Sequence, residues 1–277
     1  MNFLQAIILG LVQGIAEFLP ISSSGHLAIF QNLLHFDVDA QALQFYDVLL
    51  HLATLAVIFI VFWKDIKEML LELLCILHLR RRPRREKQNP LPRRMILFIL
   101  FGTLPLVLAL LVKDSLEALS GNLFFIATML VITGCLLYLS TQRRSGAKTL
   151  REATLRDILL VGIGQMCAVV PGLSRSGTTV SVGLFRNFEL SFAVRFSFLL
   201  SIPAVLGANL LSLVDAIKAG IDWSMLPMYL TGMAVAFVSG LASVRFLQRI
   251  VRRKKFGGFA YYCWGAALVT LCLALIS

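Results

Sequence analysis

The stretch Pro171-Gly-Leu-Ser-Arg-Ser-Gly-Thr-Thr179 interrupts a long apolar part of the chain. No charged residue occurs from Ile158 to Leu173, and Arg175 then follows between two serines. An arginine is costly in a bilayer unless it lines protein or a water-filled cavity. A proline-glycine start also breaks a helix, and broken backbone at membrane depth needs cover from protein or water. The stretch therefore predicts either a buried polar turn within a membrane protein or an ordinary loop between two helices.

A second copy of this pattern lies near the N-terminus and favours the buried turn. Gln13 and the turn 20–25 match Gln165 and the turn 171–177, with the glutamine, serines and glycine at a constant displacement along the chain. A repeat of this kind indicates a duplicated structural unit. We therefore expect a single integral membrane domain built from two repeats. The domain is expected to cover residues 1–277. The first repeat is expected at about 1–141 and the second at about 157–277.

Composition places the chain among polytopic α-helical membrane proteins. Hydrophobic residues make up 58% of the sequence, and the mean hydropathy is +0.83. Several uncharged runs reach about 20 residues, the length with which a helix crosses a bilayer. Two pairs of shorter apolar segments, each joined by a polar break, predict re-entrant helical hairpins, although a simple span for residues 1–19 stays open. The six expected transmembrane spans are residues 43–63, 95–112, 118–141, 194–214, 223–245 and 257–277, and the two hairpins are residues 1–36 and 157–190.

The positive charge is concentrated beside the expected spans. The formal net charge is +11, and 21 of the 26 Lys and Arg residues lie in a long expected loop, 64–94, and in the segments 142–156 and 245–256. This is the positive-inside pattern, so we expect these segments in the cytoplasm and no nucleic-acid partner. Both termini then lie outside. Because each repeat holds one hairpin and three crossings, the second repeat is inverted, an arrangement that brings broken helices together near the bilayer midplane.

Glu17 lies at the expected meeting point of the two polar turns. Gln13 and Glu17 are four residues apart, so they share one face of a helix. A carboxylate in an apolar membrane segment indicates a functional site. Glu17 can bind a divalent cation, with Gln13 as a neutral oxygen ligand, or act as a general base. The alternative is a structural ion pair with Arg175.

The first polar turn carries candidate phosphate ligands and nucleophiles. Ser22, Ser23, Ser24 and Gly25 can donate hydroxyl and backbone N–H groups to an anion at a helix start. Serines in such a turn also serve as helix caps, so a nucleophilic serine is one of two interpretations. His26 can shuttle a proton or act as a nucleophile, or it can be a buried structural histidine.

The second polar turn is dominated by Arg175. Its planar guanidinium matches a pair of phosphate oxygens, and the hydroxyls of Ser174, Ser176 and Thr179 offer further donors. The arginine of the second turn is expected to face the carboxylate and the histidine of the first turn. This arrangement predicts a site for a phosphate-bearing substrate and a metal ion.

Five other charged or titratable residues have less defined roles. Asp47 and His51, four residues apart at the start of the first span, are expected to line the same cavity. Arg186, Glu189 and Arg195 are expected to mark the membrane boundary.

Three stretches of the chain together resemble one known family. Gln13-Gly-Ile-Ala-Glu17 matches the family's (Glu/Gln)-x-x-x-Glu motif, and Phe18-Leu-Pro-Ile-Ser-Ser-Ser-Gly-His26 follows it. The stretch 171–179 matches the family's Pro-Gly-x-Ser-Arg-Ser-x-x-Thr motif, and weaker similarity covers nearly the whole chain. The sequence thus resembles the undecaprenyl-diphosphate phosphatases, also described as bacitracin-resistance proteins.

The resemblance implies an enzyme of the bacterial cytoplasmic (inner) membrane whose active site opens to the outer face. It would hydrolyse undecaprenyl diphosphate to undecaprenyl phosphate and inorganic phosphate with Mg²⁺ or Ca²⁺. This reaction recycles the lipid carrier of peptidoglycan synthesis for the cell wall and confers bacitracin resistance.

The family's functional residues carry over by position. Glu17 with Gln13 would serve the metal or activate the nucleophile, Ser23 or His26 would attack the terminal phosphorus, and Arg175 would neutralise charge on the transferring group. Gln13 replaces the glutamate of some members, which puts a two-carboxylate metal site in doubt.

A second function stays open at this point. Inverted repeats are known best in transporters, so the architecture alone also suits a transporter, or flippase, of the polyprenyl phosphate lipid. In both cases the expected partners are a polyprenyl lipid and the surrounding membrane lipids. The sequence leaves the oligomeric state open, and a homo-oligomer is among the states it allows.

Overall fold

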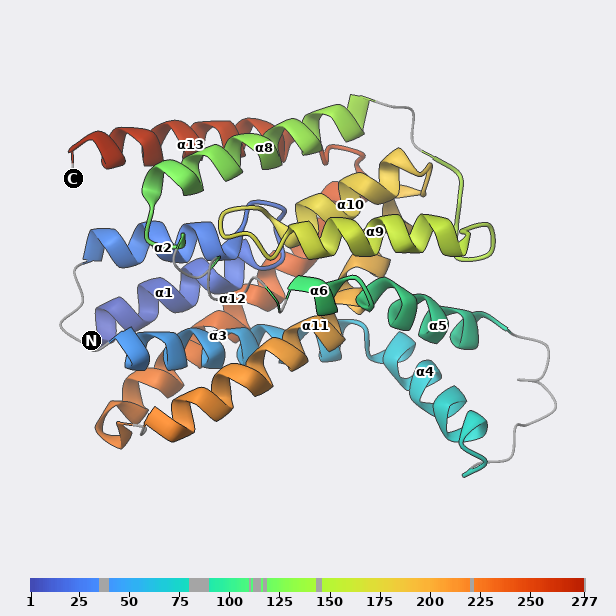
Figure 1. The fold of residues 1–277 in the computed structure, drawn as a ribbon, viewed down its shortest axis with the longest axis horizontal. Coiled ribbons are helices and arrows are strands. Elements are labelled where there is room, and N and C mark those ends of the chain that lie inside the picture. The colour runs from blue at the N-terminus through green and yellow to red at the C-terminus, as the bar shows by residue number, and fades with distance from the viewer. Residues whose placement is uncertain are drawn as a thin grey trace.

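The computed structural model describes residues 1–34, 40–79, 90–109, 111, 116, 119–142, 146–219 and 222–276. All of the named elements in this part are helices (Figure 1). In chain order they are α1 (Phe3–Ala16), α2 (Ser23–Leu34), α3 (Ala40–Val61), α4 (Trp63–Ile76), α5 (Leu91–Thr103), α6 (Leu106–Ala109), α8 (Leu123–Gln142), α9 (Leu155–Cys167), α10 (Arg175–Phe185), α11 (Leu190–Ala219), the 3₁₀ helix η3 (Trp223–Met225), α12 (Leu226–Arg252) and α13 (Gly258–Ile276).

In the described part, six helical segments are long and apolar enough to cross a membrane. Many large apolar side chains on them are exposed, which suits contact with lipid. Each segment overlaps one of the six expected spans, so the prediction of a multi-pass, all-α membrane protein is confirmed. The segments are Ala42–Val61, Leu91–Ala109, Leu123–Gln142, Leu190–Val214, Trp223–Arg252 and Gly258–Ile276.

The basic segment 64–94, which was expected to be a loop between the first two spans, begins with a helix. α4 follows α3 directly and occupies the start of segment 64–94. Its leucines recur three and four positions apart between lysines and glutamates, which is the pattern of an amphipathic helix. The expectation of a loop was wrong here because the charges of this segment were read without their apolar periodicity.

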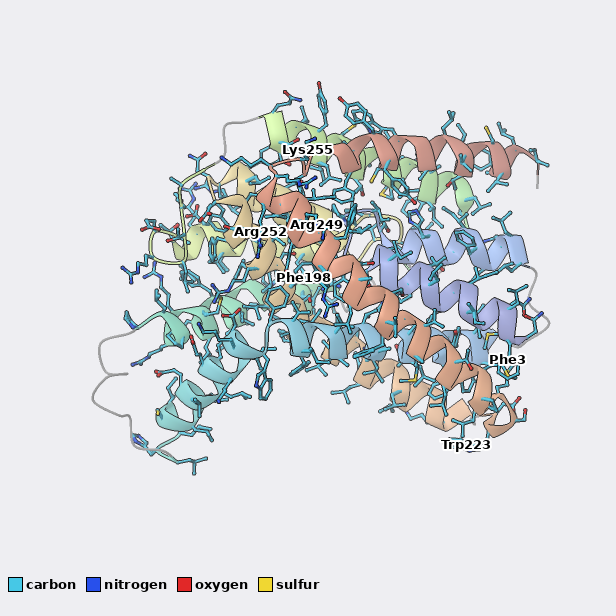
Figure 2. The ribbon with its side chains drawn as sticks, turned by 180° about the vertical axis from the view of Figure 1, so that it is seen from behind. Phe3, Phe198, Trp223, Arg249, Arg252 and Lys255 are labelled. Atoms are coloured by element: carbon cyan, nitrogen blue, oxygen red, sulfur yellow. The ribbon has the colours of Figure 1, made fainter. Side chains whose placement is uncertain are left out.

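The last basic segment is also mostly helical. α12 continues through 245–252, beyond the expected end of the span 223–245, and ends at Arg252. Arginines in the last turn of a helix are stabilised by the negative end of the helix dipole, so these charges extend the helix instead of ending it. Figure 2 shows Arg249, Arg252 and Lys255 toward this end of α12 and Trp223 beyond its other end.

Each of the two expected polar breaks separates a pair of consecutive helices. Residues 17–22 separate α1 from α2, and residues 168–174 separate α9 from α10. The breaks contain Ser22 with a backbone φ of +73° and Gly172 with a φ of +87°. Glycine adopts a positive φ without strain, whereas serine does so only when its surroundings hold it there.

The two breaks lie side by side near the centre of the molecule (Figure 1). A Cβ atom added to Gly25 would lie 3.1 Å from the Cα atom of Gly172, so the absence of a side chain at Gly25 lets the two turns approach closely. The hydroxyl of Ser24 also accepts a hydrogen bond from the backbone N–H of Gly172 at 3.4 Å. The expected meeting of the two turns is therefore present in the fold.

Glycines also hold α1 close to α12. A Cβ atom at Gly10 would lie 2.5 Å from the carbonyl oxygen of Gly232, and one at Gly14 would lie 2.4 Å from that of Ala236. Small residues let membrane helices approach closely and gain van der Waals contact. This packing fixes the position of α1, at whose end the first break begins.

The buried Asp157 anchors the second helix pair. Its carboxylate accepts hydrogen bonds from Arg186 Nε at 2.7 Å and Lys148 Nζ at 3.0 Å, and it forms a reciprocal capping box with Thr154 at the start of α9. Burial raises the pKa of Asp157, but the hydrogen bonds from Thr154, Arg186 and Lys148 outweigh it and hold the pKa below its ordinary value. Arg186, which we expected to mark the membrane boundary, thus has a structural ion pair.

Candidate active site

Glu17 is the centre of a polar cluster formed by both turns. It ends α1 and is 6% exposed. Its Oε1 accepts a hydrogen bond from Arg175 Nη2, and its Oε2 accepts bonds from Ser23 Oγ at 2.7 Å and Gln13 Nε2 at 3.1 Å. A buried carboxylate needs partners of this kind. The cluster joins three of the four residues expected to be catalytic: Glu17, Ser23 and Arg175.

Gln13 lies one helical turn before Glu17 and is fully buried. Its Nε2 donates to the carboxylate, while its Oε1 has no hydrogen-bond partner in the described part of the chain. Its counterpart in the second repeat, Gln165, is buried too, and neither the nitrogen nor the oxygen of the Gln165 side-chain amide has a hydrogen-bond partner in the described part of the chain. Four residues after Gln165, the position equivalent to Glu17 is occupied by Val169. The two repeats are therefore unequal, and only the first supplies a carboxylate.

The serines of the first turn have different surroundings. Ser22 is buried, and its Oγ accepts a hydrogen bond from the backbone N–H of Gly25 at 3.2 Å, as a helix cap does. Ser24 is exposed and bonds the second turn, while Ser23 is half-buried and donates to Glu17. Of the three hydroxyls, Ser23 alone is paired with a carboxylate that can take its proton.

The hydroxyls of the second turn hold α10 in place. Ser174 caps α10 by accepting from the backbone N–H of Gly177 at 3.1 Å. Ser176 donates to the carbonyl oxygen of Leu19 at 3.4 Å, and Thr179 shares a hydrogen bond with Ser197 at 2.6 Å. All three hydroxyls are buried. Phosphate binding by Ser174, Ser176 and Thr179 stays a prediction, and the structure gives each of them a structural bond.

His26 lies apart from the cluster around Glu17. Its Nδ1 lies 2.8 Å from the carbonyl oxygen of Ser22, and its Nε2 lies 2.9 Å from the hydroxyl of Tyr262 on α13, whose ring stacks on the imidazole. A carbonyl oxygen only accepts, so Nδ1 carries the proton and the lone pair of Nε2 faces Tyr262. Both ring nitrogens are thus engaged, whereas a nucleophilic histidine needs one of them free.

Asp47 and His51 on α3 divide between two environments. His51 Nε2 lies 3.8 Å from Glu17 Oε2, so His51 borders the cluster as expected. Asp47 turns toward α2, where both of its carboxylate oxygens accept from Gln31 Nε2 at 3.0 Å. Sequence reasoning did not find Gln31 or Tyr262, because each lies in a helix without a motif and acts through a contact between distant segments.

The donor set around Glu17 is sparse for a metal ion. The described residues contain no group of three or more His, Cys, Asp or Glu side chains placed to hold one. Glu17 and the unpartnered Oε1 of Gln13 are the oxygens available. Mg²⁺ is commonly bound by one or two carboxylates together with substrate phosphates, and this set fits that mode of binding.

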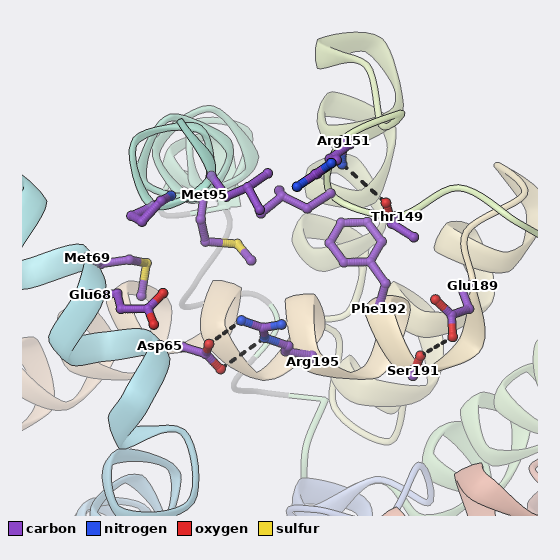
Figure 3. Close-up of a pocket in the computed structure, with 13 residues that line it drawn as sticks. Asp65, Glu68, Met69, Met95, Thr149, Arg151, Glu189, Ser191, Phe192 and Arg195 are labelled. Atoms are coloured by element: carbon purple, nitrogen blue, oxygen red, sulfur yellow. Dashed lines mark hydrogen bonds and ion pairs between the residues drawn. The ribbon is translucent and has the colours of Figure 1, made fainter. Parts of the chain in front are cut away.

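A cavity of about 350 Å³ lies between α4, α5 and the start of α11, where Glu189 and Arg195 line it (Figure 3). Arg195 donates from Nε to Asp65 Oδ2 at 2.9 Å and from Nη2 to Asp65 Oδ1, and Glu189 accepts from Ser191 at 2.6 Å. The two residues expected at the membrane boundary therefore have local partners. None of the residues lining this cavity belongs to the polar turns.

In this helical membrane protein a carboxylate, a serine and an arginine meet where two helix pairs are broken. These are groups that can serve phosphoryl transfer as base, nucleophile and cation. The comparison with known proteins makes this class specific. The family described as bacitracin resistance protein BacA matches residues 6–269, and the chain belongs to this family.

Full-length relatives agree with this assignment. A protein of Syntrophotalea carbinolica is 41% identical over 265 residues, which cover 95% of this chain and 96% of that protein. Proteins of Halothermothrix orenii and Methanosphaera stadtmanae are 36% and 37% identical, covering 99% and 100% of this chain and 99% of each relative. All three relatives carry the name undecaprenyl-diphosphatase.

Proposed function

We propose that this chain hydrolyses undecaprenyl diphosphate to undecaprenyl phosphate and inorganic phosphate in the membrane. The observation that carries the proposal is the cluster of Glu17, Ser23 and Arg175 in a chain that belongs to the bacitracin resistance protein family. The reaction recycles the lipid carrier for cell-wall synthesis and underlies bacitracin resistance. The names of the relatives favour hydrolysis over the transport of polyprenyl phosphate.

Ser23 is the proposed nucleophile and Glu17 its general base. Ser23 Oγ forms a bond to the terminal phosphorus while its proton passes to Glu17, 2.7 Å away. The bond from that phosphorus to the bridging oxygen breaks, and undecaprenyl phosphate leaves. Water then attacks the phosphoserine, which releases inorganic phosphate and restores the hydroxyl. His26 is less suited to the attack because both of its ring nitrogens are engaged.

Arg175 is the proposed phosphate ligand. Its side chain is 21% exposed, so a phosphate group entering the site can reach it beside the buried carboxylate of Glu17. Arginine binds two phosphate oxygens in parallel, and stabilisation of the developing charge is most of what a protein supplies to phosphoryl transfer. Ser24, which is exposed, is a proposed additional donor at the start of α2, and Ser22 and Gly25 would join it by exchanging their mutual hydrogen bond for bonds to phosphate.

A divalent cation, Mg²⁺ or Ca²⁺, is the proposed cofactor. Glu17 and Gln13 Oε1 would hold it, and the unpartnered, buried state of Gln13 Oε1 supports this role. The cation would neutralise charge on the diphosphate oxygens. Because the protein offers few ligands, the remaining ones would come from the substrate and water.

For the topology, we propose an inverted repeat in which α1–α2 and α9–α10 are re-entrant hairpins. The two breaks that meet at the centre support this arrangement. The basic residues at the end of α12 support a cytoplasmic location for that end (Figure 2). Both termini then face outward, and the site opens to the outer face of the cytoplasmic membrane.

The test is phosphate release from undecaprenyl diphosphate by the purified protein in detergent, with and without a chelator. We expect release that requires a divalent cation and falls about 1,000-fold or more in Ser23→Ala. Thr128→Ala, which removes an exposed hydroxyl bonded only to its own helix, serves as the matched control and should keep full activity. Wild-type protein that releases no phosphate with any cation would refute the proposed reaction.

A further inference from the structure

His51 lies outside both polar turns, yet it borders the proposed active site. It comes from α3, and its Nε2 is 3.8 Å from Glu17 Oε2, the oxygen that also accepts from Ser23. The side chain of His51 is 29% exposed, whereas that of Glu17 is 4% exposed. A molecule that enters the cluster from the accessible side can therefore touch His51 beside the carboxylate.

The orientation of the His51 ring is fixed by its own helix. Nδ1 lies 2.8 Å from the carbonyl oxygen of Asp47, which can only accept, so Nδ1 carries a proton in either charge state of the ring. Gln31 in turn holds the carboxylate of Asp47 at 3.0 Å. These bonds leave Nε2 as the ring atom that faces Glu17.

Nε2 of His51 has no hydrogen-bond partner among the described residues. The distance to Glu17 is beyond hydrogen-bonding range, and the hydrogen bond of this ring is made through Nδ1. His26 differs, because both of its nitrogens are engaged. Of the two histidines near the turns, His51 is thus the one with an open nitrogen at the cluster.

The carboxylate of Glu17 stands between two groups that can bind phosphate. Arg175 bonds its Oε1, and His51 approaches its Oε2. Glu17 and Arg175 together carry no net charge, so a phosphate group held by Arg175 is bound more firmly with a further ligand beside this pair. An imidazole nitrogen can bond a phosphate oxygen in both charge states, by accepting from a protonated oxygen or by donating to an ionised one.

We propose that His51 Nε2 binds the terminal phosphate of the substrate and positions it for attack, an inference that rests on the proposed diphosphatase function. His51 is then a substrate contact contributed by α3. Arg175 and His51 hold the phosphate from the two sides of Glu17, next to the hydroxyl of Ser23. The bond through Nδ1 keeps the ring in the orientation that this contact requires.

Kinetics of phosphate release from farnesyl diphosphate provide the first test. In His51→Phe, which keeps a ring but no hydrogen-bonding nitrogen, we expect KM to rise about tenfold, the effect of one lost hydrogen bond to a charged group. His51→Gln keeps a polar group at this place and should stay within about threefold of wild type. His78→Gln, at an exposed position after α4, is the matched control. Unchanged KM and kcat in His51→Phe would overturn the proposal.

A second test uses the unmodified protein and does not depend on hydrolysis. Carbethoxylation of each histidine by diethyl pyrocarbonate is followed by mass spectrometry, with and without the methylene-bridged analogue of farnesyl diphosphate at saturation. We expect the analogue to slow labelling of His51 about tenfold, with His78 unaffected. Equal labelling of His51 with and without the analogue would refute the contact. If the wild type releases no phosphate but His51 is protected, the proposed reaction fails and the binding contact stands.

Discussion

The ion pair of Glu17 and Arg175 links the stability of the fold to its chemistry. Arg175→Ala leaves a carboxylate that is 4% exposed, with hydrogen bonds from Ser23 and Gln13 and with His51 Nε2 at 3.8 Å but without its arginine partner. Removing one partner of a buried ion pair costs about 3–5 kcal/mol, because the other charge stays buried and unpaired. The Arg175 side chain is itself 21% exposed, so we expect a value near the lower limit, about 3 kcal/mol.

A double-mutant cycle separates this structural cost from catalysis. Glu17→Gln removes the buried charge, so Arg175→Ala should cost about 1 kcal/mol in that background, a coupling of about 2 kcal/mol. The free energy of unfolding is measured by denaturant titration in detergent, and phosphate release is measured on the same samples. The double variant should lose about 2 kcal/mol less stability than the sum of the two single variants, and it should remain inactive. If Arg175→Ala lowers the free energy of unfolding equally in the wild-type and Glu17→Gln backgrounds, the ion pair of Glu17 and Arg175 does not stabilise the fold.

Three further predictions concern residues around the site. Asp157 has a pKa held below its ordinary value in the folded protein, so it stabilises the fold at neutral pH, and this contribution is lost as the pH falls below about 3.9; Asp157→Asn should remove that dependence in thermal unfolding curves. Tyr262→Phe frees Nε2 of His26; because both ring nitrogens of His26 make structural contacts, activity should stay within about threefold while the melting temperature falls, and a loss of about 100-fold would contradict a structural role for His26. Gly14→Leu should separate α1 from α12 and reduce the yield of folded protein, whereas Leu at Gly207, which has open space around it, should be tolerated.

Hydropathy was sufficient to predict the six spanning segments, because an apolar run of that length has few other stable states. The contact between the turns was predictable from the repeat, since the same polar pattern recurs in two apolar settings. The helical state of α4 was not predicted, because the periodicity of its leucines was not weighed against its charges.

The detailed roles at the site depended on geometry that the sequence does not contain. Ser23 and His26 were equivalent candidates by spacing, and only their surroundings separate them: one hydroxyl faces Glu17, while the imidazole faces Tyr262. The hydroxyl of Thr179 suggested a phosphate ligand, but it bonds Ser197, which belongs to another helix. Contacts between distant segments of this kind have no signal in a single sequence.

The central claim is that the cluster at the meeting point of the two turns hydrolyses a lipid diphosphate. The most direct measurement is the initial rate of inorganic phosphate release from undecaprenyl diphosphate in liposomes by wild type, Glu17→Gln and Arg175→Lys. We expect a cation-dependent rate for wild type and losses of about 100-fold or more in both variants, even though each keeps the approximate shape of the site. Variants with wild-type rates would contradict the claim and place the chemistry elsewhere in the molecule.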